Sequence, residues 1–248
     1  MRLNYLQGRL YQTISKGILP NLAIGLGIQF DRYYKLRIDE TYSQNLSGYE
    51  KYGDITLEAY SSDGLTIDLV FDNRRNTIDP DKGAYFIASF RQNAKFIGSL
   101  KIWNSINIEA RKYFPISKKR DQILALRSLY LSILSGEPNY LDLPSNGWDN
   151  NGKTTRGIYR NRYRSSGLLY FEAEYRTAIT KNGLWGMATF CNLTSSALLF
   201  TQQYQRPYFA GGAGLRLKLD KRTGSKLSFD IGVSKEYITF YLALKEYF

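Results

Sequence analysis

Two short stretches of the chain carry the side chains most able to do chemistry. Residues 154–166 read TTRGIYRNRYRSS, with four arginines and no acid, and Glu172 and Glu174 follow two positions apart in LLYFEAEYR. On a strand this spacing puts both carboxylates on one face, where they could form a catalytic acid–base pair or accept forked hydrogen bonds from a guanidinium. We favour structural pairing with an arginine over catalysis.

The residue types that most catalytic sites need are scarce. The 248 residues contain no His and one Cys, Cys191. This composition excludes Ser-His and Cys-His catalysis, a disulfide within the chain, and a metal cage built from Cys or His. We therefore expect no enzyme, no cofactor and no metal, and we interpret Cys191 as an outward or buried apolar residue without chemistry.

The charge balance limits the kinds of partner. A net charge of +12 fits nucleic acid or an anionic membrane surface, and a solvated basic surface is the plain alternative. The positive charge gathers in turns and loops and forms no groove interleaved with aromatic residues, so a nucleic-acid binder ranks last. The 21 Tyr residues favour strands and suit a surface between lipid and water.

Apolar and polar residues alternate along most of the chain, which predicts strands. We expect about eleven, near 3–14, 21–37, 64–73, 83–92, 99–114, 122–134, 167–178, 184–193, 208–219, 225–234 and 237–247, with 54–60 as a candidate twelfth. Strands of about ten residues that are apolar outward and polar inward are typical of a membrane barrel. A soluble barrel or sandwich stays open, because each segment's signal is weak by itself.

The connections between the expected strands mostly alternate between short and long. Tight links near 15–20, 73–82, 115–121, 180–182 and 220–224 separate longer stretches at 38–63, 135–166 and 194–207. Membrane barrels have short periplasmic turns and long outer loops, a rhythm that a Greek-key sandwich does not need. No window approaches 18 uninterrupted apolar residues, and the start MRLNYLQGRL lacks the apolar core of a signal peptide. The sequence therefore predicts an all-β, antiparallel transmembrane β-barrel.

Three stretches together resemble one protein family. FDNRRNTIDPDKGAYFIASF (71–90) is similar to a strand, a periplasmic turn and the next strand of that family, and TRGIYRNRYRSSGLLYFEAEYR (155–176) to its Arg-Gly loop and the acidic strand behind it. Residues 212–248, with GAGLRLKLD, LSFDIGVS and ITFYLALKEYF, resemble its last three strands. The family is the bacterial surface antigen family, the BamA/TamA-type outer-membrane assembly and translocation barrels. The match covers most of residues 64–248 in the same order.

The resemblance implies that the Arg-Gly loop folds into the lumen and is locked there. The locked residues would be Arg156, Gly157, Ile158 and Tyr159, the last two as an apolar tip. Their implied partners on the next two strands are Glu172, Glu174, Phe190 and Asn192. Phe190 would stack on the guanidinium. The family has an aspartate where this chain has Asn192, so we expect the two glutamates to hold more of the charge.

The resemblance also implies what surrounds the loop. Phe240, Leu242, Leu244 and Phe248 resemble the signal by which such barrels are assembled. Family barrels have sixteen strands, and five of the expected strands follow the loop while six precede it. We therefore expect a single barrel domain over 1–248, with an extracellular plug-like loop at 135–166, that forms the C-terminal part of a longer, sixteen-stranded barrel.

The implied function is to insert or translocate polypeptides in the bacterial outer membrane, through a seam between the first and last strands. The expected partners are outer-membrane lipid and lipopolysaccharide, polypeptide clients, and periplasmic or accessory assembly subunits. Two alternatives stay open. One is a passive diffusion channel, which would not need a locked arginine loop, and the other is a barrel that anchors an upstream hydrolase domain.

Overall fold

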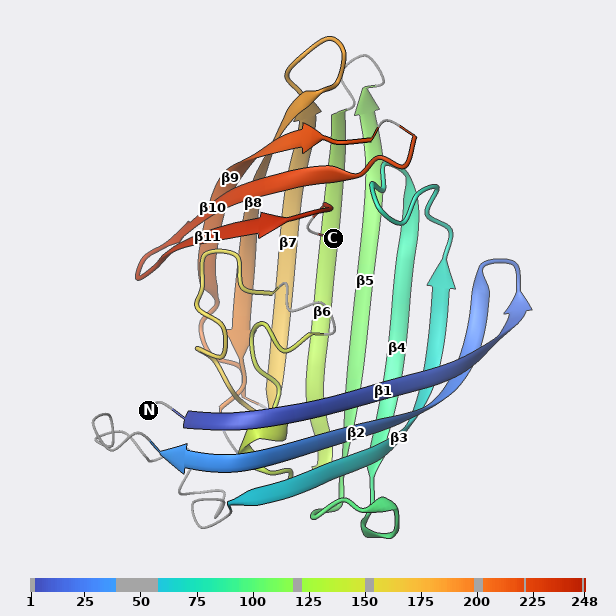
Figure 1. Cartoon of the computed structure of the whole chain (residues 1–248), viewed down its shortest axis with the longest axis vertical. Coiled ribbons are helices and arrows are strands. Elements are labelled where there is room, and N and C mark those ends of the chain that lie inside the picture. Colours follow the sequence, from blue (N-terminus) through green and yellow to red (C-terminus); the bar gives the residue numbers. More distant parts are fainter. Residues whose placement is uncertain are drawn as a thin grey trace. The chain divides into compact units, whose positions relative to one another are not determined.

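The computed structural model describes residues 3–38, 58–117, 122–149, 154–198, 203–220, 222–246 and 248. They form eleven strands and two short 3₁₀ helices (Figure 1). The strands are β1 (Leu3–Leu19), β2 (Leu22–Ile38), β3 (Ala59–Asp72), β4 (Gly83–Asn93), β5 (Trp103–Ser117), β6 (Gln122–Gly136), β7 (Gly167–Ala178), β8 (Trp185–Ser196), β9 (Tyr208–Lys218), β10 (Lys226–Ser234) and β11 (Ile238–Ala243). The 3₁₀ helices are η3 (Lys95–Ile97) and η5 (Tyr140–Asp142).

The strands follow one another in a single sheet, in the order in which they occur in the chain. Each pair whose register is described, β1–β2 and the four pairs from β7 to β11, is antiparallel. This open, all-β antiparallel sheet confirms the predicted fold class. Within the described residues, no helix is both long and apolar enough to cross a membrane.

Several strand ends differ from those that the sequence predicts. β1 continues to Leu19, because the turn to β2 is tightened by Asn21, whose φ is +64°. β3 begins at Ala59, so the end of the candidate strand 54–60 belongs to β3, while 54–57 lies outside the described residues. β11 ends at Ala243 and not near 247, because Glu246 and Phe248 turn inward and are buried.

The described residues form two compact units. Unit 1 comprises Met1–Val70, Ala88–Asn107 and Ser132–Leu143, and unit 2 comprises Phe71–Ile87, Ile108–Leu131 and Pro144–Phe248. Unit 2 contains all the residues that were predicted to lock the loop, including Arg156, Glu172 and Glu174. Each unit is described separately below.

Unit 1 is polar on its buried face and apolar on its exposed face. Asp31 is buried and accepts hydrogen bonds from the Arg9 Nε at 2.8 Å, from the Arg91 Nη1 at 3.0 Å and from the Tyr11 hydroxyl at 2.7 Å. Two guanidinium groups and a hydroxyl therefore replace the hydrogen bonds that this carboxylate would make to water. The opposite face of β1 exposes large apolar side chains, such as Ile14 at 80%.

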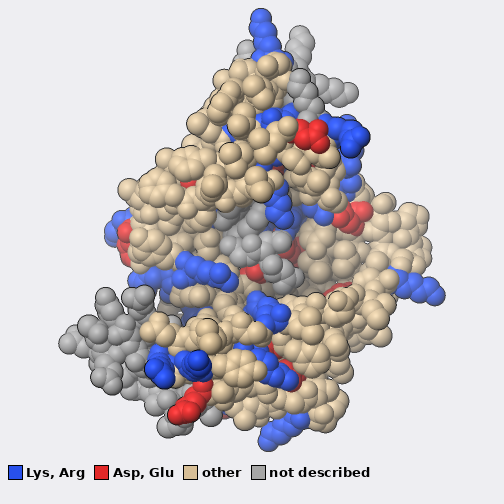
Figure 2. Space-filling view, viewed as in Figure 1, with Lys and Arg blue, Asp and Glu red and all other residues tan. Residues whose placement is uncertain are grey.

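Unit 2 has the same inverted distribution along β7 to β11. Glu174, Arg216 and Asp230 are at most 3% exposed, whereas Leu215 and Leu242, on the other face, are 50% and 72% exposed. A sheet in water would bury its leucines and expose its charges. On the face of the molecule shown in Figure 2, most of the surface is neither acidic nor basic, and Lys and Arg gather in separate patches. Strands that face hydrocarbon require this distribution.

A charge placed on the apolar face provides a direct test of what that face contacts. Leu215 lies within β9, opposite Phe229 of β10 and Met187 of β8. If this face contacts lipid tails, Leu215→Arg is expected to lower the free energy of unfolding in phospholipid vesicles by about 2–4 kcal/mol. Urea titration of the refolded protein measures this difference.

The matched control is Leu219→Arg, because Leu219 is also exposed, at 57%, but lies just beyond the end of β9. Near the membrane interface an arginine costs only about 0–1 kcal/mol. Equal effects of the two substitutions would contradict a lipid-facing sheet.

Candidate functional site

The connection between β6 and β7 is irregular but internally braced. The Asn146 side-chain Nδ2 donates to the Tyr159 carbonyl at 2.6 Å, and its Oδ1 accepts from the Tyr163 backbone N–H at 2.8 Å. The Asn146 carbonyl accepts a third bond, from the Asn161 N–H at 2.9 Å. One buried asparagine therefore holds the two described arms, 144–149 and 154–166, against each other. We call these two arms the Arg156 loop.

The first arm of the Arg156 loop is fixed to β6 by a buried ion pair. The Arg127 Nη2 donates to the Asp149 Oδ2 at 2.9 Å, and the Arg127 Nε donates to Glu109 of β5 at 2.7 Å. The other Asp149 oxygen accepts from the Thr154 backbone N–H at 3.1 Å and from its hydroxyl at 2.8 Å. Asp149 thus connects the strand to both arms of the loop.

Arg156 is the largest fully buried side chain of the described residues. Its Nη1 donates to the Glu172 Oε1 at 2.6 Å and also to the Glu174 carboxylate, and its Nη2 donates to the Asp230 Oδ2 at 2.7 Å. The Arg156 Cζ lies over the Phe190 ring, 3.7 Å from the ring centroid. One arginine therefore joins the loop to β7, β8 and β10.

The charges around Arg156 keep it ionised. Burial alone would lower the pKa of the guanidinium, but attraction by Glu174, Glu172 and Asp230 raises that pKa well above its usual value. Two further arginines share the negative charge: the Arg176 Nε donates to Glu174 at 2.6 Å, and the Arg216 Nη1 donates to Asp230 at 2.5 Å. Each buried carboxylate is therefore paired, as burial of charge requires.

Glycines allow the loop backbone to approach the sheet closely. Gly157 has a φ of +81°, and a Cβ on it would lie 2.6 Å from the Ala210 Cβ on β9. A Cβ on Gly232 of β10 would lie 2.5 Å from the Gly157 nitrogen. The Gly157 N–H donates to the Thr239 hydroxyl on β11 at 2.9 Å, and the Asn192 Nδ2 on β8 donates to the Arg156 carbonyl at 2.9 Å. Hydrogen bonds thus hold the backbone of the tip to β8 and β11, in addition to those that hold the Arg156 side chain.

The structure separates the two residues expected at the apolar tip. Ile158 is 1% exposed, whereas Tyr159 is 56% exposed, with its ring centroid 4.5 Å from that of Tyr237 in the β10–β11 turn. The tip that enters the interior therefore ends with Ile158. Tyr159 instead contacts the turn between two strands, next to the hydrogen bond from the Arg162 Nε to the Tyr237 hydroxyl at 2.7 Å.

Asp230 is a site residue that the sequence does not single out. Glu172 and Glu174, which were expected to hold more of the charge because Asn192 is neutral, both pair with Arg156, and Asp230 supplies a third carboxylate. The sequence feature that could have identified Asp230 is the polar face of the 225–234 segment, where Ser228, Asp230 and Gly232 alternate with apolar residues. Cys191, which is adjacent to Asn192, is exposed on the other face of β8.

The residues expected to form an assembly signal divide into two groups. Phe240, Leu242 and Leu244 share an exposed face, at 65%, 72% and 70%. Phe248 is 4% exposed, and its ring lies 5.6 Å from the Arg176 guanidinium, which also donates to the Phe248 main-chain oxygen at 2.8 Å. Phe248 therefore belongs to the buried charged network and not to the apolar face of β11.

In the parts of the chain that the structure describes, no three His, Cys, Asp or Glu residues are arranged to hold a metal ion. The carboxylates of Glu172, Glu174 and Asp230 all point to the Arg156 guanidinium. This arrangement holds the Arg156 loop in place by charge-assisted hydrogen bonds.

Comparisons with known proteins identify the fold. No protein-family model and no curated protein matches the chain. Among solved structures, BamA from Haemophilus ducreyi lacking POTRA domains 1–3 superposes with a TM-score of 0.66 at 13% sequence identity. The alignment covers 96% of this chain and 53% of that one, so the chain spans about half the length of the structure that it matches. The fold is that of a partial BamA-like β-barrel.

Proposed function

We propose that this chain is part of a bacterial outer-membrane β-barrel that inserts or translocates polypeptides. The observation that carries the proposal is the Arg156 loop, whose buried guanidinium joins an irregular segment to three carboxylates on β7 and β10. A passive diffusion channel does not need to hold a loop in this way. The apolar exposed face and the BamA-like fold support the same function.

The proposed mechanism uses strand pairing and no covalent step. β11 is the last strand in the strand order of the described residues, and it would form one side of the seam. The backbone groups at a sheet edge can pair with a strand of another chain, and in lipid each unpaired group costs several kcal/mol. An unfolded client strand would satisfy these groups as it enters the membrane. The Arg156 loop would keep β10 and β11 in place while the edge exchanges partners.

An insertion assay tests this function. The whole protein that carries this chain is refolded into phospholipid vesicles, and a urea-unfolded outer-membrane β-barrel is added as client. We expect the client to become folded and protease-resistant faster than in empty vesicles. The same vesicles are tested for leakage of a small polar solute. Rapid leakage without faster client insertion would overturn the proposal and favour a diffusion channel.

A further inference from the structure

A cavity of about 460 Å³ lies in unit 2, beside the turns that follow β3, β7 and β9 and the adjoining ends of β5 and β6. Its volume is within the range of about 300–1,000 Å³ that is usual for ligand sites. Two kinds of cationic side chain line it. Arg176 and Arg216 are buried, whereas Lys82 and Arg222 are exposed. The cavity is therefore basic both inside and at the surface.

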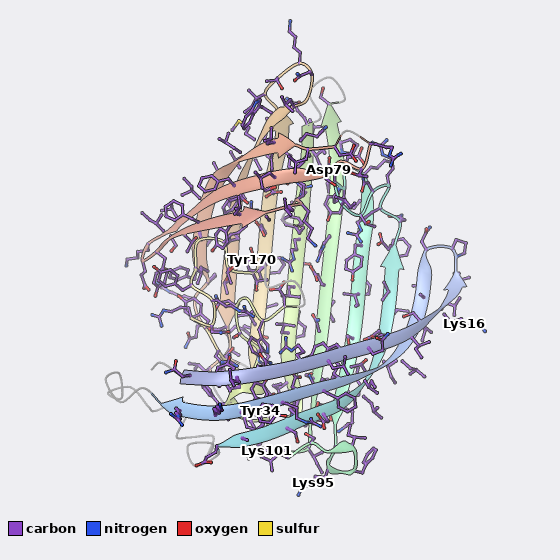
Figure 3. All side chains as sticks on the ribbon, in the orientation of Figure 1. Lys16, Tyr34, Asp79, Lys95, Lys101 and Tyr170 are labelled. Carbon is purple, nitrogen blue, oxygen red and sulfur yellow. The ribbon has the colours of Figure 1, made fainter. Side chains whose placement is uncertain are left out.

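Two turns that are distant in the sequence interlock to form part of this cavity. The Asn76 Nδ2 donates to the Thr223 carbonyl at 3.0 Å, and the Lys226 Nζ donates to Asp79, labelled in Figure 3, at 2.7 Å. A Cβ on Gly224 would lie 2.7 Å from the Asp79 Cβ, so the turns are in close contact. The cavity is thus defined by specific contacts between the β3–β4 and β9–β10 turns.

The buried cations of the cavity already bind an acidic segment of the chain itself. Glu246 follows β11, and its carboxylate accepts from the Arg216 Nε at 2.8 Å and the Lys226 Nζ at 3.0 Å. Burial alone would raise the pKa of Glu246, but attraction by Arg176, Arg216 and Lys226 lowers that pKa below its usual value. The cavity therefore stabilises a carboxylate carried by an irregular, partly apolar segment.

The exposed cations have no such partner. Among the described residues, neither Lys82 nor Arg222 has an acidic side chain within ion-pair distance, whereas Arg75 is paired with Asp81. The cavity wall also includes apolar side chains, among them Leu184 and Ile123. Free cations beside an apolar wall fit a ligand that carries both a carboxylate and a hydrophobic group.

We propose that this cavity binds an acidic, partly apolar peptide segment of another protein. A carboxylate of the peptide pairs with Lys82 and Arg222, and a neighbouring apolar side chain packs on Leu184 and Ile123. Glu246 occupies the inner end of the same cavity in an equivalent way. The cavity shares Arg176 and Arg216 with the charged network around Arg156, but Lys82 and Arg222, which would bind the peptide, form no ion pair with that network. Peptide binding does not depend on whether the barrel inserts clients.

Fluorescence anisotropy of a labelled Asp-Leu-Asp-Leu-Asp peptide tests the proposal, with the whole protein refolded in neutral detergent micelles. We expect saturable binding that weakens with salt, and no binding of Lys-Leu-Lys-Leu-Lys. Lys82→Gln together with Arg222→Gln is expected to weaken binding about three- to tenfold, since exposed ion pairs are individually modest. Both side chains are exposed, so the variant is expected to fold.

The matched control is Lys16→Gln together with Lys95→Gln, which removes the same charge from exposed residues of unit 1 (Figure 3). It is expected to bind the acidic peptide as the unchanged protein does. Three results would overturn the proposal: equal binding of both peptides, equal weakening by both double substitutions, or complete displacement by inorganic phosphate at low concentration. These measurements report peptide binding alone, so their result can be told apart from that of the insertion assay.

Discussion

Arg156→Ala is expected to release the Arg156 loop and to lower the free energy of unfolding by about 3–5 kcal/mol, the usual cost of leaving buried charges without their partner. Glu172, Glu174 and Asp230 would remain in the interior without the guanidinium that joins them. Urea titration in vesicles measures the stability. Limited proteolysis of the loop reports its release, because a held loop is cut slowly.

Two further substitutions separate the role of the positive charge of Arg156 from that of the forked shape of its guanidinium. Arg156→Lys keeps the charge but cannot donate forked hydrogen bonds to three carboxylates, so we expect an intermediate stability. Arg160→Ala removes an exposed arginine of the same loop and is expected to change stability by no more than about 0.5 kcal/mol. If Arg156→Ala behaved like Arg160→Ala, the loop would not be held by this residue.

Gly157→Ala is expected to displace the loop although no charge is changed. The backbone at Gly157 is left-handed, and an added methyl group would lie 2.6 Å from the Ala210 Cβ. Strain and overpacking together predict a loss of about 2–4 kcal/mol and faster proteolysis of the loop. The same urea titration and proteolysis measure both effects.

The double variant Gly157→Ala with Ala210→Gly provides the internal control. It removes the clash but keeps the strained backbone, so we expect it to recover part of the lost stability. Gly17→Ala is the external control, because a Cβ at Gly17 would meet no atom within 4 Å. A Gly157→Ala protein as stable as the Gly17→Ala protein would show that the tip does not approach the sheet.

The alternation of residue types was sufficient to predict most of the fold. Period-2 patterns predict both the strands and their faces, because neighbouring residues on a strand point to opposite sides. The strand ends are less predictable, since they depend on distant contacts. β11 ends early because Glu246 is drawn to Arg216 of β9 and Lys226 of β10, and Phe248 to Arg176 of β7. No local pattern shows these attractions.

The candidate site was predicted to a similar extent. Glu172 and Glu174 follow Arg156 closely in the sequence, so their types and spacing indicate an ion pair. Asp230 is 74 residues from Arg156 and becomes a partner only when β10 is placed in the sheet. Ile158 is buried and Tyr159 is exposed because of the left-handed turn at Gly157, which no alternation pattern predicts.

The most direct test of the central claim is a crosslink between the Arg156 loop and β11. The Tyr241 hydroxyl donates to the Thr155 carbonyl, so Thr155→Cys with Tyr241→Cys, in a Cys191→Ser protein, is expected to crosslink with a short bis-maleimide in vesicles. Leu242, the next residue, points to the opposite face and is 72% exposed, so Thr155→Cys with Leu242→Cys is expected not to crosslink. Rapid labelling of the Thr155→Cys loop by a membrane-impermeant maleimide, with no crosslink to either strand position, would contradict a loop held inside the barrel.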